Sequence, residues 1–518
     1  MQRSASGSSW AIATPSDDAT GAGAGAFDRG GNAIDAALAA ATAIAVTAPA
    51  SCGVGGDLFA LVQRPDGEML CVNSSGRAPA AADPDAVRER HDEMPVRGPV
   101  PVTVPGAVAG WQALHDLGAT LPWGSAFGRA IELAADGMRV SRGVAETLQE
   151  PGEHFAEDPG LSGIFFVDGA AVSQGTSVRQ PALAATLAAI AGGGSDVWYR
   201  GEVGRSFVEG LRAAGSPMST EDLAAHRAVV LPPLRAAYQD LHVSVAPPNS
   251  QGFVLLEILS LVERLGIDPG PLGSDAGMVA RVFAAAAADR DRHLADPDRM
   301  KVHPSTLLDD GHLAGLADDL RAAHAATPHG RRPDGDTIAL VTADAEGFAV
   351  SLIQSLFWGF GSGICEPATG VVAHNRGACF SLEPGHPNAF VPGVRPAHTL
   401  MPVIAHDDRG HAAVAGTMGG YSQPQINAQT LLHLFGGALP ADAVAAPRWA
   451  VERGAGAPVT VERDVPEPVR GSIISAGFDL TIVPERSSDL GHAQLIRVRP
   501  EGFVVGSDPR SDGGAAAG

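Results

Sequence analysis

Residues 336–351 read Asp-Thr-Ile-Ala-Leu-Val-Thr-Ala-Asp-Ala-Glu-Gly-Phe-Ala-Val-Ser. A polar loop over residues 333–336 gives way to Thr337 and an apolar, alternating run. A turn over residues 344–347 follows, and then a second run of the same kind. This order predicts a β-hairpin. Thr favours strands by itself, so a hairpin that merely begins with Thr would explain this stretch taken alone.

Composition and charge limit the classes of partner. The chain has 518 residues, of which 45% are hydrophobic, which is ample for a large core. Its formal net charge is −22. Nucleic acids and anionic membrane surfaces attract basic proteins, so neither is expected as a partner.

The cysteines and the first residues limit the compartment and the cofactors. Four cysteines show no CxxC spacing, which argues against a zinc site or a disulfide framework. We therefore expect no metal and no cofactor. Residues 1–7 lack the apolar stretch of an export signal, and the apolar residues 36–46 are too short to span a bilayer. A cytoplasmic, membrane-free protein is the expectation.

The chain divides into a largely helical part and a strand-rich part. Residues 33–48 predict a buried helix, and residues 58–63 predict a strand. Further helices are expected over residues 123–137, 180–191, 203–214, 275–289, 312–326 and 424–435, and further strands over residues 337–342, 349–354, 399–406 and 412–416. The Gly- and Ala-rich residues 513–518 predict a disordered tail. Periodicity alone supports an α+β fold built in layers.

Eight short motifs, in order along the chain, resemble those of the γ-glutamyltransferase (γ-glutamyltranspeptidase) family. They occupy residues 30–37 (GGNAIDAA), 53–57 (GVGGD), 104–111 (VPGAVAGW), 288–292 (ADRDR), 360–363 (FGSG), 395–396 (RP), 416–420 (GTMGG) and 508–513 (DPRSDG). Each motif alone is weak evidence, but their order over nearly the whole chain is specific.

The resemblance implies an N-terminal-nucleophile (Ntn) hydrolase, a fold with four layers in the order αββα. It also implies that the chain cuts itself between Asp336 and Thr337. The products would be a large segment, residues 1–336, and a small segment, residues 337–518. The two would stay associated as one structural unit, and a homodimer of that unit is left open.

The resemblance assigns the catalytic groups. Thr337 would supply the hydroxyl nucleophile, and its freed α-amino group, with an ordinary pKa near 8, would act as the base. Ser355 stands where the family has a hydroxyl residue bonded to the nucleophile. Gly419 and Gly420 match the family's oxyanion hole, in which backbone N–H groups stabilise a developing negative charge. A serine at a strand end and a tight turn are the plain structural alternatives for these positions.

Five residues are predicted to contact the substrate: Arg77, Asn375, Arg376, His398 and Thr399. Asn375 also suits a turn. The family's arginine for the substrate carboxylate falls at Ser75, with Arg77 two positions on. The family's acid for the substrate ammonium group falls at Cys379. These changes predict a substrate with a carboxylate and without an α-amino group.

The sequence therefore predicts a self-processing amidohydrolase or acyltransferase that cleaves a small amide through a Thr337 acyl-enzyme. The altered pocket is similar to the oxamate amidohydrolase branch of the family. An enzyme of that type, or a glutaryl-type acylase without γ-glutamyl transfer, is the alternative. An uncleaved, non-catalytic binding protein is the alternative from another class.

Overall fold

Two seven-stranded antiparallel sheets form the centre of the computed structural model, which describes residues 2–322, 336–408, 410, 412–453 and 456–518. The first sheet runs β1 (Ser4–Gly7), β22 (Gly502–Ser507), β21 (Ala493–Arg499), β17 (Ala412–Thr417), β16 (Val403–His406), β11 (Leu241–Val245) and β10 (Leu234–Tyr238). The second runs β23 (Gly514–Ala517), β2 (Trp10–Thr14), β12 (Asp336–Asp344), β13 (Ala349–Phe357), β3 (Asp57–Gln63), β4 (Met69–Ser74) and β9 (Val229–Leu231).

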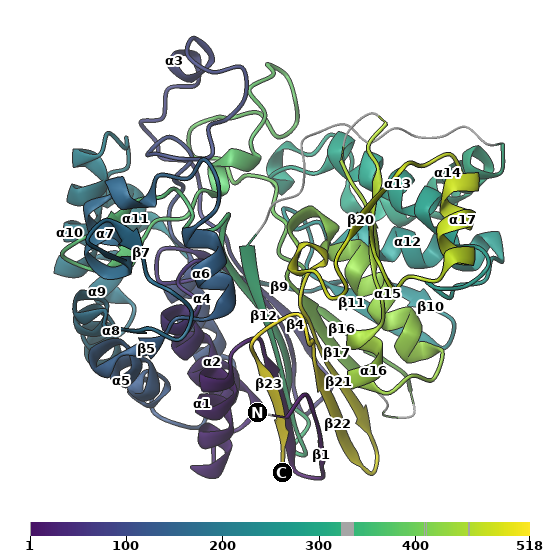
Figure 1. The fold of residues 1–518 in the computed structure, drawn as a ribbon, viewed down its shortest axis with the longest axis horizontal. Coiled ribbons are helices and arrows are strands. Elements are labelled where there is room, and N and C mark those ends of the chain that lie inside the picture. The colour runs from purple at the N-terminus through teal and green to yellow at the C-terminus, as the bar shows by residue number, and fades with distance from the viewer. Residues whose placement is uncertain (1, 323–335, 409, 411, 454–455) are drawn as a thin grey trace.

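The two sheets stack face to face, and helices cover the outer face of each (Figure 1). Side chains alternate between the faces of a strand, as β12 shows. Ala339 and Val341 pack between the sheets, whereas Ile338 and Leu340 pack against helices. Helices α1 (Asp17–Asp28), α2 (Ala33–Thr47), α5 (Gly128–Asp136) and α8 (Pro181–Gly193) belong to that outer core. On the other side lie α12 (Gly252–Leu265), α13 (Ala276–His293) and α15 (Gln423–Phe435). The layers follow the order αββα, which confirms the predicted fold class.

Further helices complete the shell. They are α3 (Pro84–Arg88), α4 (Ala107–Asp116), α6 (Arg142–Leu148), α7 (Pro159–Phe165), α9 (Asp196–Tyr199), α10 (Glu202–Ala213), α11 (Thr220–Ala225), α14 (Asp310–Arg321), α16 (Pro440–Ala445) and α17 (Glu467–Ser475). A small third sheet joins β18 (Trp449–Val451), β19 (Val459–Glu462) and β20 (Leu480–Val483). Among the described residues, no helix has the length and apolar content needed to cross a membrane.

The innermost helix shows how the sequence builds this core. Every residue of α2 is buried, and most of them are alanines, which form helices well and let neighbours approach closely. Asn32 and Asp35 form a reciprocal capping box at the start of α2. The Asp35 carboxylate also accepts hydrogen bonds from the backbone N–H groups of Thr120 and Leu121, which ties α2 to the loop before α5.

The prediction of a disordered tail was wrong. Residues 514–517 form β23, which pairs with β2 from Thr14↔Gly514 to Ala11↔Ala517. Composition suggested disorder, but the ladder supplies the backbone hydrogen bonds that a tail lacks. A Cβ at Gly513 would lie 1.9 Å from the Thr14 carbonyl oxygen, so the strand needs a glycine where it enters the sheet.

Other boundaries differ from the sequence prediction. The helix expected over residues 123–137 is a short 3₁₀ turn, Trp123–Ala126, followed by α5. The strand expected from residue 399 begins at Val403. The last helix before the hairpin begins at Asp310, and the end predicted for it at residue 326 lies outside the described residues. So does the polar loop that precedes Asp336.

Candidate active site

Thr337 lies at the start of the ladder that pairs β12 with β13, at the end of the hairpin away from its turn. Asp336 pairs with Phe357 and Ile338 with Gln354, so the register shifts at Thr337. Such a shift re-aims a side chain relative to the regular ladder. The Thr337 hydroxyl lies 3.0 Å from the Ser355 hydroxyl, and Thr337 is 2% exposed. The backbone N–H of Phe357 donates to Ser355 Oγ at 2.7 Å and so fixes that hydroxyl beside Thr337.

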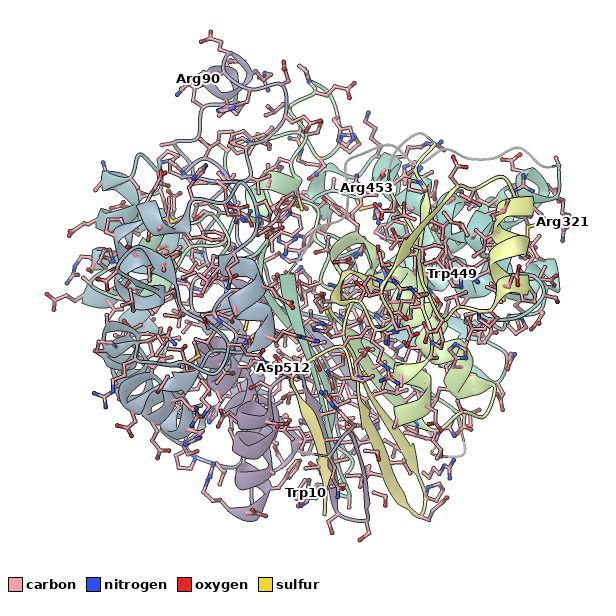
Figure 2. All side chains as sticks on the ribbon, viewed as in Figure 1. Trp10, Arg90, Arg321, Trp449, Arg453 and Asp512 are labelled. Carbon is pink, nitrogen blue, oxygen red and sulfur yellow. The ribbon has the colours of Figure 1, made fainter. Side chains whose placement is uncertain are left out.

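A cavity of about 980 Å³ opens beside Thr337. Its wall includes Thr337, Trp358, Gly419, Arg142, His492 and Asp512. Asp512 lies near the middle of the view in Figure 2. The structure thus brings the predicted nucleophile and the first glycine of the predicted oxyanion hole to the same space.

The two glycines follow β17 in backbone conformations that suit glycine. Gly419 has φ 135° and Gly420 has φ 50°. The Gly420 carbonyl accepts a hydrogen bond from Gln251 Nε2 at 2.9 Å, which fixes the orientation of this turn. The described residues offer no hydrogen-bond acceptor to the N–H of either glycine. An N–H pair without a partner is what an oxyanion hole requires, although a tight turn needs the same residues.

A buried charged cluster lies behind Ser355. Asp57 is the ladder partner of Ser355, and His398 Nε2 donates to Asp57 Oδ2 at 3.0 Å. His374 Nδ1 lies 3.5 Å from the same oxygen. Burial alone would raise the pKa of Asp57, but His374 and His398 hold that pKa at about 2.

His398 is neutral in this setting and is fully used within the protein. Burial, with a further contribution from Arg376, lowers the pKa of His398 to about 3. Its Nδ1 accepts a hydrogen bond from the Leu400 N–H at 3.2 Å, and its Nε2 binds Asp57. Both ring nitrogens are therefore occupied within the protein, and neither is available to a substrate. We infer that His398 holds Asp57 in position.

Arg376 is a fully buried cation. Among the described residues no carboxylate forms an ion pair with it, although its charge helps to lower the pKa of nearby Asp57. Its Nη1 donates to Thr399 Oγ1 at 3.0 Å, and its guanidinium carbon lies 4.0 Å from the centre of the Phe357 ring. Nε and Nη2 are buried and have no hydrogen-bond partner among the described residues. Phe357 is the ladder partner of Asp336, so this guanidinium lies close to the predicted cleavage point.

The other two predicted substrate contacts lie in different settings. Asn375 is buried, accepts a hydrogen bond from the Trp358 N–H at 3.2 Å and donates to the Val96 carbonyl at 2.8 Å. Arg77 is partly exposed, donates to the Gly393 carbonyl and pairs with Asp296 at 3.4 Å. Neither residue lines the Thr337 cavity. Arg376 and Thr399 do not line it either. Arg376 is linked to the start of β12 through the Phe357 ring, whereas Arg77 lies apart, with Gly393 and Asp296.

A second cavity, of about 390 Å³, borders Phe357 and Trp358. Cys379 and Tyr421 lie in its wall, and the Tyr421 hydroxyl donates to Cys379 Sγ at 3.3 Å. Arg453, labelled in Figure 2, stacks 3.9 Å from the centre of the Tyr421 ring.

The residues of this site that had no role in the sequence prediction include Asp57, His374, Tyr421 and Arg453. For Asp57 the available signal was a lone acid directly after the glycines of the 53–57 motif.

Comparisons with known proteins agree with this architecture. The family described as gamma-glutamyltranspeptidase matches residues 19–518. An oxamate amidohydrolase proenzyme of Klebsiella pneumoniae is 38% identical over 503 residues, covering 94% of each chain. A glutathione hydrolase-like proenzyme of Bacillus subtilis is 32% identical over 525 residues, covering 99% of each chain.

A solved structure gives the same result. The crystal structure of cephalosporin acylase from Bacillus halodurans superposes with a TM-score of 0.90 and 31% sequence identity. The match covers 100% of this chain and 97% of that chain. The chain belongs to the γ-glutamyltranspeptidase family of Ntn hydrolases and is an amide-cleaving enzyme of that family.

Proposed function

We propose that this chain cuts itself before Thr337 and then hydrolyses a small amide that carries a carboxylate and lacks an α-amino group. The observation that carries this proposal is Arg376, a buried guanidinium that stacks on Phe357, the ladder partner of Asp336, and has two nitrogen atoms without a hydrogen-bond partner among the described residues. An unpaired buried cation is costly, and a substrate carboxylate that accepts bonds from Nε and Nη2 would compensate it.

The surroundings of Arg376 disfavour a substrate ammonium group. Cys379 stands where the family has an acid, so this position offers no carboxylate to pair with a substrate ammonium group. Asp291, a carboxylate in the wall of the second cavity, is already paired with Arg290 at 2.9 Å and Arg453 at 3.2 Å. The remaining acids in that wall, Asp92, Glu93 and Glu383, are exposed to water.

The reaction would follow the chemistry of an N-terminal threonine. The freed amino group of Thr337 takes the proton of the Thr337 hydroxyl as the oxygen attacks the amide carbonyl. The N–H groups of Gly419 and Gly420 stabilise the oxyanion. The proton then passes to the leaving amine, and water hydrolyses the resulting ester to free the acid and Thr337.

The test compares kcat/KM for a glutaryl anilide and the matching γ-glutamyl anilide, with oxamate assayed separately. We expect the glutaryl compound to exceed the γ-glutamyl compound by roughly tenfold or more, about 1.4 kcal/mol. Arg376→Gln should abolish the preference, whereas Arg200→Gln, a change at an exposed arginine paired with Asp196, should keep it. A wild-type enzyme that prefers the γ-glutamyl compound tenfold would overturn the substrate proposal.

A further inference from the structure

A cluster of four ligand-type side chains lies where helices α12, α13 and α14 meet, on the side of the first sheet away from Thr337 (Figure 1). Glu257 comes from α12, Asp289 and His293 from α13, and His312 from α14. Asp289 and His293 are four residues apart, so they project from the same face of α13. Nothing in the amide-cleaving chemistry uses any of them.

The two carboxylates are buried next to each other. Glu257 is 0% exposed and Asp289 is 2% exposed. Neither oxygen of Glu257 has a hydrogen-bond partner among the described residues. Glu257 also interrupts a buried apolar run on α12, where a leucine or a glutamine would be cheaper to bury. An unpartnered, fully buried carboxylate that faces a second one requires a positive charge or a proton.

The distances suit a metal ion. His312 Nε2 lies 2.8 Å from Asp289 Oδ2 and 3.9 Å from Glu257 Oε1. His293 Nε2 lies 3.5 Å from Asp289 Oδ1. The ligand atoms of Glu257, Asp289 and His312 all lie within 4.8 Å of one another. Ligands about 2.1 Å from a tetrahedral zinc ion are separated by roughly 3.4 Å, a value inside this range.

We propose that Glu257, Asp289 and His312 form a site for a divalent transition metal of the zinc type, with His293 beside Asp289 at its edge. Imidazole and carboxylate donors suit such an ion, and its two charges balance the two carboxylates. The His312 side chain is 26% exposed, so the ion has a short path from solvent. The exposed Arg292, whose Nη1 lies 4.0 Å from Asp289 Oδ1, is a competing cation.

A metal at this site would stabilise the helices whose side chains hold the turn at Gly420. Arg290, next to Asp289 on α13, donates to Gln251 Oε1 at 3.2 Å and to the Tyr421 carbonyl at 3.0 Å. Gln251 in turn holds the Gly420 carbonyl. A metal that joins α12, α13 and α14 would therefore stabilise the helices from which these contacts come, without taking part in the chemistry.

The experiment measures metal content and thermal stability of the purified full chain. We expect about one equivalent of metal per chain by elemental analysis. After treatment with a chelator, added Zn²⁺ should raise the Tm by about 3 °C or more. Glu257→Gln and His312→Asn should lose both the bound metal and the shift. Asp318→Asn, which removes an exposed carboxylate from α14, should keep both.

A different result would overturn the site. If the wild type holds no metal, shows no Zn²⁺-dependent shift, and is no more stable than Glu257→Gln, a proton shared by the two carboxylates explains the cluster. A Zn²⁺ shift that persists in both Glu257→Gln and His312→Asn would place the metal elsewhere. Amide cleavage is measured separately, so failure of this inference leaves the proposed function untouched.

Discussion

The hydroxyl groups of Thr337 and Ser355 lie 3.0 Å apart across two neighbouring strands of one hairpin. Eighteen residues separate them in sequence, yet the turn between β12 and β13 returns the chain to the same end of the sheet. The contact places a fixed hydroxyl beside the predicted nucleophile, and each group can be tested by itself.

Self-cleavage is the first prediction. The purified chain should give fragments of 336 residues and, since 518 − 336 = 182, of 182 residues. Thr337→Ala should remain one chain and be inactive, because both the nucleophile and the new amine are lost. Thr337→Ser should still cleave. Edman sequencing of the small fragment must begin Thr-Ile-Ala, and any other start would refute the assigned bond.

The Ser355 hydroxyl should matter for both cleavage and turnover. Removing one hydrogen bond to a reacting group costs roughly 1–3 kcal/mol, so Ser355→Ala should slow both about tenfold or more. Ser355→Thr keeps the hydroxyl and should retain most activity. The half-time of cleavage and kcat are measured for each variant. If Ser355→Ala cleaves itself and turns over substrate as fast as the wild type, Ser355 has no role beyond its place in the strand.

The glycine turn should be needed for chemistry more than for folding. Gly420→Ala puts a Cβ at φ 50° and tilts the N–H pair, so we expect kcat to fall by roughly 10²–10³. Gly437→Ala is the matched control, because Gly437 also has positive φ, 101°, with nothing within 4 Å of an added Cβ. Both variants should show similar circular dichroism. Near-normal turnover in Gly420→Ala would assign the pair to a structural turn.

Substituting the two arginines predicted to bind the substrate should lower kcat/KM to different extents. Arg376→Gln should lower kcat/KM for a glutaryl anilide by roughly 10- to 100-fold, the value of a charge-assisted contact. Arg77→Gln should lower it less, because the partly exposed Arg77 is already paired with Asp296 and the Gly393 carbonyl. The reverse order would mean that Arg77 moves into the site when a substrate binds.

Acid should destabilise the protein through neutral histidines that are buried or half-buried. Burial lowers the pKa of His398 to about 3 and those of His226, His433 and His492 to about 4. The unfolded chain therefore binds more protons below pH 6.5, and stability falls as the pH drops from there toward 4. The loss should be on the order of 1 kcal/mol per histidine at pH 5.5.

The measurement compares Tm at pH 7.5 and pH 5.5 in the uncleaved Thr337→Ala chain. His433→Gln should reduce the difference by the share of one histidine, whereas His91→Gln, at an exposed position, should not change it. A Tm that is constant over this range would show that these histidines are already protonated or solvated.

The hairpin was predictable because its signal is local. Alternation over residues 337–342 and 349–354 specifies two strands, and a Gly-containing turn joins them. Disorder at residues 513–518 was predicted from composition, which contains no information about the β2 strand that these residues pair with. Sequence patterns report local preferences, and a ladder between distant segments overrides them.

The candidate site likewise has one part that the sequence could predict and one part that it could not. Motif order located Thr337, Ser355 and the two glycines. It could not show that residues 57, 374 and 398 meet, because strand pairing and two loops bring them together. It also could not distinguish Arg376, which is buried, from Arg77, which is partly exposed.

The interleaved sheets have a consequence for genetics. In the second sheet, β12 and β13 lie between β2 and β3, so residues beyond 336 are hydrogen-bonded on both sides to residues before it. Two fragments held in this way could separate only by unfolding, and they would not trade partners with other copies. Two inactive variants produced in the same cell, one altered at Asp57 and one at Gly420, should therefore fail to complement each other. The two fragments of each molecule would therefore stay together from synthesis to unfolding, without exchange between copies.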